Sequence, residues 1–294
     1  MLRDKKPVVV SYWWGDRCTN TSFDYIKNKP EKGKTYKELA MSFEKNAKKH
    51  GLDVYTEEIP TGDYQTLINN KPAFILRMMK KFPQRPILYL DIDMRIHKKP
   101  ILFTKTNGFY DYMAFNWNTE HRVNTKCFDW ITLETSGGIH YFNNNEHAKR
   151  LLRLWNEAIQ KPVHKHKADD RILAMVFKKS KAYRWLKFYW IPLEYFFVPQ
   201  YFRNVVSTKS IVISHPYQMT NERESTNRVP TSYDKIVKKT IKTFPYIIES
   251  SSHPVVKKET QGRNKALRIP LFTKRMEVLD SKYDIAYWSN NRKV

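Results

Sequence analysis

The spacing of apolar and polar residues changes along the first hundred residues, and this pattern predicts strands that alternate with helices. Short apolar or alternating runs predict strands, while Leu39, Phe43 and Ala47 recur at helical spacing in a segment that Gly51 ends. The predicted elements are a strand at 7–12, a helix at 35–50, a strand at 52–58, a helix at 71–82 and a strand at 86–96. This order predicts an α/β fold, with a mixed, mainly parallel central sheet and helices on both of its faces.

The second half of the chain is more mixed, and its periodicity weakens near residue 225. The predicted elements there are strands at 110–117, 136–142 and 210–214, a helix from 145 to about 160, and a shorter helix that starts near Asp169. We therefore expect a catalytic domain over residues 1–225 and a basic C-terminal extension over 226–294. Within the extension, 233–244 has the pattern of an amphipathic basic helix.

The most informative stretch is RPILYLDIDMRIHKKP, residues 85–100, where an apolar strand runs into Asp91 and Asp93. In a strand, residues two apart point to the same side, so both carboxylates are expected on one face with their Cα atoms about 6.6 Å apart. Burying such charge costs several kcal/mol unless it is neutralised. A hard divalent cation would neutralise it. Alternatively, the acids lie exposed at the strand end and pair with Arg95 or Lys98.

Glycine usage bears on how a phosphate group would be bound. The chain has eight glycines and no GxGxxG motif. The tripeptide GKT at 33–35 is not a phosphate-binding loop, because Asn28 stands where the first glycine of that motif is required. A nucleotide diphosphate would therefore need a cation in place of a cradle of backbone amides.

Five segments together resemble the GT-A-fold glycosyltransferases, in the glycogenin-like group of the nucleotide-diphospho-sugar transferase superfamily. They are VVVSYW, KPAFILRMMKKFPQRPILYLDID, TSGGIHYFNNNEHAKRLLRLW, ADDRILAMVF and ISHPY, in order between residues 7 and 217. The resemblance implies that Asp91 and Asp93 bind a metal that carries the donor diphosphate, and that His215 completes the metal shell. Asp169 matches the first residue of an Asp-Gln motif, and Asp170 stands where the family has glutamine.

Further candidates follow from the resemblance, each beside a plainer alternative. Ser136, Gly137 and Gly138 would let backbone approach the sugar, or they form a simple turn. Asp169 and Asp170 would be catalytic, with Asp170 facing the sugar, although one of them is explained equally well as a helix N-cap.

Five residues are expected to contact the donor. Tyr12, Trp13 and Trp14 end the first strand, where a base or ribose would stack on them, unless they belong to an aromatic core. Lys71 and Arg77 lie on the helix before the acid pair, and as exposed helix charges they would need no ligand.

The resemblance implies a metal-dependent transferase that uses Mn²⁺ or Mg²⁺. It would move a sugar from a nucleotide-diphosphate donor, by default a UDP-sugar, to a hydroxyl of a glycan or glycoprotein, with retention of configuration. A Lewis-acid cation stabilises the charge on the departing diphosphate. The alternative is a metal-dependent nuclease or other phosphoryl-transfer enzyme, which uses the same acids and gives the basic charge a purpose. A non-catalytic basic binding module is a third alternative, but it leaves the acid pair unexplained.

Composition adds information on partners and location. The chain has 53 lysines and arginines against 29 acidic residues, a net charge of +24, spread along its length. Such charge makes a generally basic surface and allows peripheral contact with anionic surfaces, but by itself it does not indicate a specific nucleic acid. Two cysteines, the lack of an apolar run long enough to span a bilayer and the lack of a secretory signal predict a cytoplasmic enzyme, viral or bacterial, in the host cytoplasm if viral.

Overall fold

The computed structural model describes most of the first 215 residues. The described residues are 6–15, 22–24, 29–105, 108–116, 133, 135, 137–164, 167–198 and 206–215, with only the backbone described at 22–24, 29–31 and 105. Ser136 and the whole predicted extension, including the helix expected at 233–244, lie outside them.

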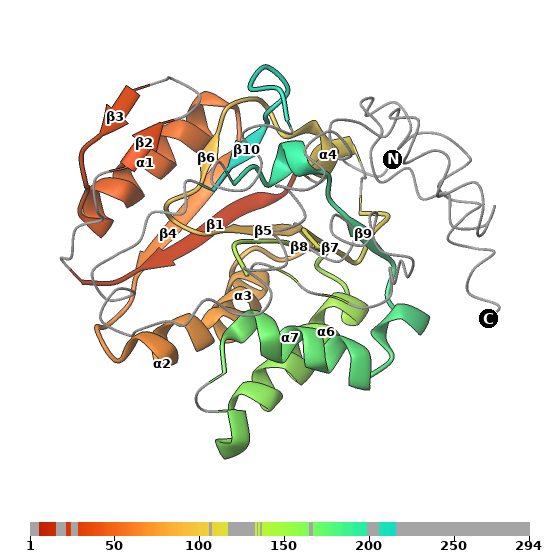
Figure 1. Cartoon of the computed structure of the whole chain (residues 1–294). Coiled ribbons are helices and arrows are strands. Elements are labelled where there is room, and N and C mark those ends of the chain that lie inside the picture. The colour runs from red at the N-terminus through yellow and green to blue at the C-terminus, as the bar shows by residue number, and fades with distance from the viewer. Residues whose placement is uncertain are drawn as a thin grey trace, which may run out of the picture.

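A six-stranded sheet forms the centre of the fold (Figure 1). Its strands, in spatial order, are β4 (Asp53–Glu58), β1 (Val8–Trp13), β5 (Ile87–Leu90), β8 (Ile139–Phe142), β7 (Tyr112–Ala114) and β9 (Phe188–Trp190). β8 runs antiparallel to both of its neighbours, and the other neighbouring strands pair in parallel. This confirms the predicted mixed, mainly parallel sheet.

Both faces of the sheet are covered, and β1 shows why. All six of its residues are buried, which is typical of a central strand in a doubly covered sheet. Val10 and Tyr12 enter one apolar cluster, whereas Val9 and Trp13 enter the other, because successive side chains point to opposite faces. The sheet therefore separates two hydrophobic cores.

Helices lie against each face. α1 (Tyr36–Lys49) packs on one side, where Leu39 and Phe43 join the cluster of Val9. On the other side Figure 1 shows α3 (Lys71–Lys81), α6 (Glu146–Ile159) and α7 (Asp169–Lys179) side by side. The shorter elements are α2 (Tyr64–Asn69), α4 (Ile101–Lys105), η2 (Pro162–His164), η3 (Ala182–Arg184) and η4 (Leu193–Tyr195).

Side-chain caps explain where several helices start. Thr35 and Glu38 form a reciprocal capping box at α1, and Asn145 caps α6. At α7 the N-cap is Ala168, with no side-chain bond, so the interpretation of Asp169 or Asp170 as the N-cap was wrong. Both aspartates instead occupy the first turn, where their negative charge favours the positive end of the helix dipole.

The segment around the acid pair differs from its prediction. β5 ends at Leu90, and a turn closed by a hydrogen bond of 2.9 Å from the Met94 amide to the Asp91 carbonyl follows it. β6 (Arg95–Ile96) then pairs antiparallel with β10 (Ile213–Ser214) in a separate two-stranded sheet. The prediction of one continuous strand over 86–96, with both acids on its face, was therefore wrong.

Two further observations complete the fold. β2 (Ser22–Asp24) and β3 (Lys29–Glu31) pair as a small antiparallel ribbon. Among the residues that the structure describes, no helix has both the length and the apolar character needed to cross a membrane.

Candidate metal and donor site

The candidate site lies where β5 ends and β8 begins. Asp91 is the first residue after β5, and its amide donates a 2.9 Å hydrogen bond to the carbonyl of Gly138, immediately before β8. Because Leu90 and Ile139 are partners in the sheet, this bond continues the ladder by one step into the turn. The acid turn and the glycine pair are thus held together by backbone.

The pairing of β6 with β10 brings a third side chain to the same place. Ser214 lies opposite Arg95, so the next residue, His215, comes beside the turn that carries the acids. The His215 amide donates to the carbonyl of Phe197 over 2.8 Å. A hydrogen bond of 2.8 Å between His97 and the Ser214 hydroxyl supports the ladder.

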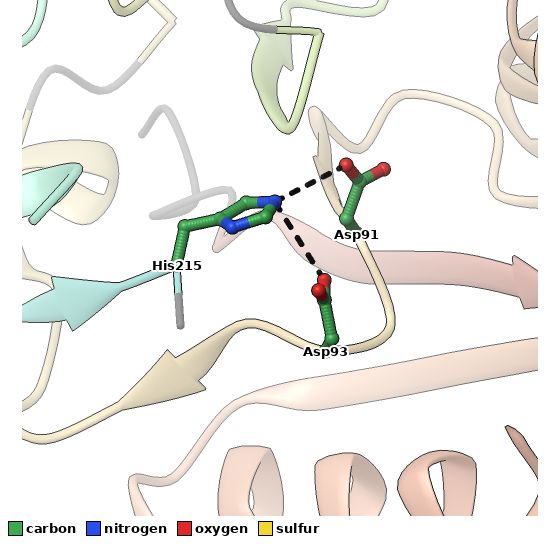
Figure 2. Close-up of side chains that lie close together, drawn as sticks. All are labelled: Asp91, Asp93 and His215. Atoms are coloured by element: carbon green, nitrogen blue, oxygen red, sulfur yellow. Dashed lines mark ion pairs between the residues drawn. The ribbon is translucent and has the colours of Figure 1, made fainter. Parts of the chain in front are cut away.

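Asp91, Asp93 and His215 form a group whose ligand atoms converge (Figure 2). The Nε2 atom of His215 lies 3.7 Å from Oδ2 of Asp91 and 3.7 Å from Oδ1 of Asp93. These separations are too long for hydrogen bonds. Donor atoms around an octahedral cation of Mg²⁺ size are separated by about 3 Å when adjacent and about 4 Å when opposite. Two carboxylates and an imidazole at this spacing fit a small divalent cation.

Gly138 is required for this convergence. A Cβ atom at this position would lie 3.0 Å from Cδ2 of His215 and 3.2 Å from Oδ2 of Asp91. Both neighbours are near the limit of carbon contacts, so any side chain at Gly138 would push the two ligand residues apart. The small residue that the sequence places here therefore has a steric role in the site.

Lys71 lies behind the acid turn and is buried, which excludes its interpretation as an exposed helix charge. Its Nζ atom lies 2.8 Å from Oδ2 of Asp169, donates over 2.7 Å to the carbonyl of Gly137 and lies 3.7 Å from Oδ1 of Asp91. Asp169 and the Gly137 carbonyl lie within hydrogen-bonding distance of the ammonium group, whereas Asp91 interacts with it through charge alone. Lys71 thus joins α3, α7, the glycine pair and the acid turn.

Electrostatics keep this network ionised. Burial would raise the pKa of Asp91, but the positive charge of Lys71, the His215 ring and the Tyr89 hydroxyl outweigh it and hold the pKa below its usual range. Burial would likewise lower the pKa of Lys71, but Asp169 and Asp91 outweigh it and raise that pKa. Asp91 is therefore a carboxylate at neutral pH, in the form that binds cations.

Gly137 turns the chain toward α7. Its φ of +74° lies in the left-handed region, which glycine adopts without strain. A Cβ atom there would lie 3.3 Å from Nζ of Lys71 and 3.4 Å from Cβ of Asp170. Both aspartates of α7 are therefore next to the glycine pair, Asp169 buried by its ion pair and Asp170 partly exposed.

The other predicted site residues are less close to the acids. Tyr12 is buried, and its hydroxyl donates to the carbonyl of Leu67 over 2.9 Å. Trp13 is buried in the cluster on the α1 side of the sheet. Arg77 pairs with Glu57 of β4. Ser136 is outside the described residues.

Sequence reasoning missed Tyr89 as part of the site. Its hydroxyl donates to Oδ1 of Asp91 over 2.8 Å, so that oxygen is used and Oδ2 faces His215. The signal was its place two residues before Asp91, on an apolar strand where a hydroxyl needs a partner.

An aromatic group at the end of β1 was recognised only in part. Trp14 is partly exposed, and its ring lies 5.6 Å from that of Tyr36 and 6.3 Å from that of Tyr64. It also stacks on Tyr12 at 6.0 Å. Of the three aromatic residues that end the first strand, Trp14 is the one that solvent reaches most.

Known proteins similar to this chain are found by structure and not by sequence. No protein-family model and no curated protein matches the sequence. The structure is similar to that of a glycosyltransferase involved in the glycosylation of the major capsid of PBCV-1, with a TM-score of 0.46 and 13% identity over 79% of this chain and 98% of that chain.

Two other solved structures are similar. For the galactosyltransferase LgtC in complex with donor and acceptor sugar analogs, the TM-score is 0.42 and the identity 12%, over 79% of this chain and 96% of that chain. For the apo form of the glycosyltransferase GlyE of Streptococcus pneumoniae, the TM-score is 0.42 and the identity is 14%, over 81% of this chain and 64% of that chain. All three are glycosyltransferases. The chemistry of the candidate site depends on the residues of this chain.

Proposed function

We propose that the protein is a metal-dependent glycosyltransferase. It moves a sugar from a nucleotide-diphosphate donor, a UDP-sugar by the sequence resemblance, to a hydroxyl of a glycan or glycoprotein. The convergence of Asp91, Asp93 and His215 around one point, beside a glycine that makes room for it, is the observation that carries this proposal. Because His215 is part of the site, the catalytic unit includes at least the residues from β1 to His215, within the domain proposed at 1–225.

The three converging residues would hold Mn²⁺ or Mg²⁺. When bound, the cation supplies positive charge against the diphosphate that leaves the sugar. The chain offers no glycine-rich phosphate loop, and this favours a cation as the group that binds the diphosphate. The side chains of Asp91 and Asp93 are 29% and 16% exposed, so a ligand can reach them from solvent.

The residues of α7 and α3 position the donor around this centre. Lys71 and Asp169 hold each other in a buried pair and fix the carbonyl of Gly137. We place Asp170 beside the sugar, where a carboxylate stabilises positive charge on the anomeric carbon or accepts the proton of the acceptor hydroxyl. Asp169 then acts as a positioning residue.

The base of the donor is proposed to bind at the end of β1. Tyr12 and Trp13 are part of the core that supports this end, and Trp14 is the ring that a base or ribose can reach. Its neighbours Tyr36 and Tyr64 would complete an aromatic wall.

Thermal unfolding with Mn²⁺ and nucleoside diphosphates tests the proposal. UDP or GDP should raise the melting temperature only when Mn²⁺ is present, because the metal links the diphosphate to the acids. Asp93→Asn should keep the melting temperature of the apo-protein within a few degrees and abolish the metal-dependent rise. Asp63→Asn, at the cap of α2, is the matched control and should keep the rise. A rise that survives in Asp93→Asn would contradict the metal assignment.

A hydrolysis screen of sugar nucleotides with Mn²⁺ identifies the donor. Slow release of sugar from one donor, lost on chelation, is the expected result, and the anomeric coupling of the first product by NMR reports retention or inversion. Cleavage of DNA on addition of Mg²⁺, without hydrolysis of any sugar nucleotide, would instead indicate a phosphoryl-transfer enzyme.

A further inference from the structure

Seven exposed lysines and arginines follow α7 and the segments on either side of it, and we call them the α7 basic strip. They are Lys161, Lys167, Arg171, Lys178, Lys179, Lys181 and Arg184. Residues 161–187 contain nine lysines and arginines against two acids, Asp169 and Asp170. Those two acids face the candidate site, so the strip itself is uniformly positive.

Ion pairs to acidic side chains neutralise several surface cations outside the strip. Lys48 pairs with Glu44, Arg85 with Asp53, and Lys149 and Arg153 with Glu146. Within the part of the chain that the structure describes, none of the seven strip residues has an acidic partner. Their positive charge is therefore directed to solvent or to a ligand.

The opposite layer of the molecule is less basic than the strip. Residues 35–58, which include α1 and β4, carry four lysines against five acidic residues. Figure 1 shows α1 and α7 on opposite sides of the sheet. A chain with a net charge of +24 thus has one nearly balanced helical face and one strongly basic edge.

The part of the strip on α7 begins at the site. Asp169 and Asp170, in the first turn of α7, lie against Gly137, and Arg171 follows at once. Arg171 and Lys178 are two turns apart on one side of the helix, about 10 Å along its axis. From Arg171 onward the strip therefore leads away from the place where the sugar would be transferred.

We propose that the α7 basic strip binds the acceptor, and that the acceptor is a glycan that carries carboxylate groups. This rests on the proposed function, because the strip is assigned to the acceptor on the ground that its α7 part starts beside Asp170. Guanidinium and ammonium groups spaced along one helix bind successive carboxylates of an extended chain, and arginine does so with two parallel hydrogen bonds. The acceptor end would lie beside Asp170, and the rest of the glycan along the strip.

Two other anionic partners fit the surface less well. Peripheral membrane binding requires apolar side chains that insert among the lipids. Single-stranded nucleic acid requires exposed aromatic platforms on which bases stack. In the described segments the exposed large hydrophobic residues are Met41, on α1, and Val163, so a single such side chain lies within the strip.

Binding of polygalacturonate, a glycan with a carboxylate on every sugar, tests the proposal. The strip variant is Arg171→Glu with Lys178→Glu. The matched control is Lys45→Glu with Lys49→Glu on α1, which changes the net charge equally and also reverses one cation in the last turn of a helix. Dextran, single-stranded DNA and phosphatidylserine vesicles are compared at low and at high salt, and thermal unfolding checks that both variants fold.

The strip variant should bind polygalacturonate about tenfold or more weakly than the wild type, because each lost charged hydrogen bond is worth about a factor of ten. The control should bind like the wild type, and dextran should not bind. Equal weakening in both variants would mean that only net charge matters and would overturn the proposal. Strip-dependent binding of DNA or vesicles, with none of polygalacturonate, would overturn it as well.

Donor hydrolysis by the wild type separates this inference from the proposed function. If glycan binding depends on the strip but no sugar nucleotide is hydrolysed, the strip is supported as a glycan-binding surface and the proposed transferase activity is rejected. If hydrolysis depends on metal but glycan binding does not depend on the strip, the transferase activity is supported and the strip is rejected as the acceptor site.

Discussion

Two charged groups meet at the start of β8, and they are built differently. The pair of Lys71 and Asp169 is closed, with side chains 6% and 8% exposed and 2.8 Å between their charged atoms. The group of Asp91, Asp93 and His215 is open, with 3.7 Å between the imidazole and each carboxylate. A closed pair satisfies its own charges, whereas an open group of acids leaves room for a cation. The contrast separates residues that hold the structure from residues that bind.

The largest expected effect comes from breaking the closed pair. Lys71→Met leaves Asp169 buried without its counter-charge, so the free energy of unfolding should fall by about 3–5 kcal/mol. Urea denaturation measures it. Lys80→Met makes the same chemical change at an exposed position of the same helix and should cost less than about 0.5 kcal/mol. Equal stability of the two variants would show that the pair contributes nothing.

Substitution of Gly138 is expected to have a smaller effect on stability and a large effect on Mn²⁺ binding. Gly138→Ala crowds His215 and Asp91 and should destabilise the fold by about 1–3 kcal/mol, as overpacking does. Mn²⁺ affinity, measured by calorimetry, should fall at least tenfold because the ligands are pushed apart. Gly62→Ala is the control, since its Cβ would meet only Leu67 at an ordinary 3.7 Å. Unchanged Mn²⁺ affinity in Gly138→Ala would contradict the steric role.

The smallest effect on stability is expected at Tyr89, whose hydroxyl contacts Asp91 of the open group. Tyr89→Phe removes one hydrogen bond to Asp91 and should cost about 1 kcal/mol of stability. Mn²⁺ affinity should fall only a few fold, since Oδ2 of Asp91 still faces His215. Tyr55→Phe, whose hydroxyl makes a long 3.4 Å contact with Glu57, is the control. A complete loss of binding in Tyr89→Phe would place Tyr89 among the essential residues.

The sequence was sufficient to predict the architecture, because its main signals are local. Helical spacing located α1, α3 and α6, and apolar runs located the buried strands. Asp91 and Asp93 stood out for a local reason too, since acids that follow an apolar strand need a partner. Strand ends were less predictable, because the position where a ladder stops depends on what pairs with it.

The geometry of the site could not be predicted, because it depends on contacts between distant segments. The acids lie in a turn because β6 leaves the main sheet to pair with β10. The partnership of Lys71 with Asp169 joins two helices that are adjacent only in space. Lysine in the first turn of a helix, where the dipole disfavours it, was the one local sign that Lys71 has an acidic partner.

The place of β10 in the chain has a consequence for biogenesis. The main sheet is complete once β9 has been synthesised, at Trp190, but His215 comes later. A nascent or truncated polypeptide that stops between these points would have every strand of the main sheet and still lack one of the three residues proposed to bind the cation. The proposed metal site is therefore complete only after the main sheet, once the segment that carries β10 and His215 has docked.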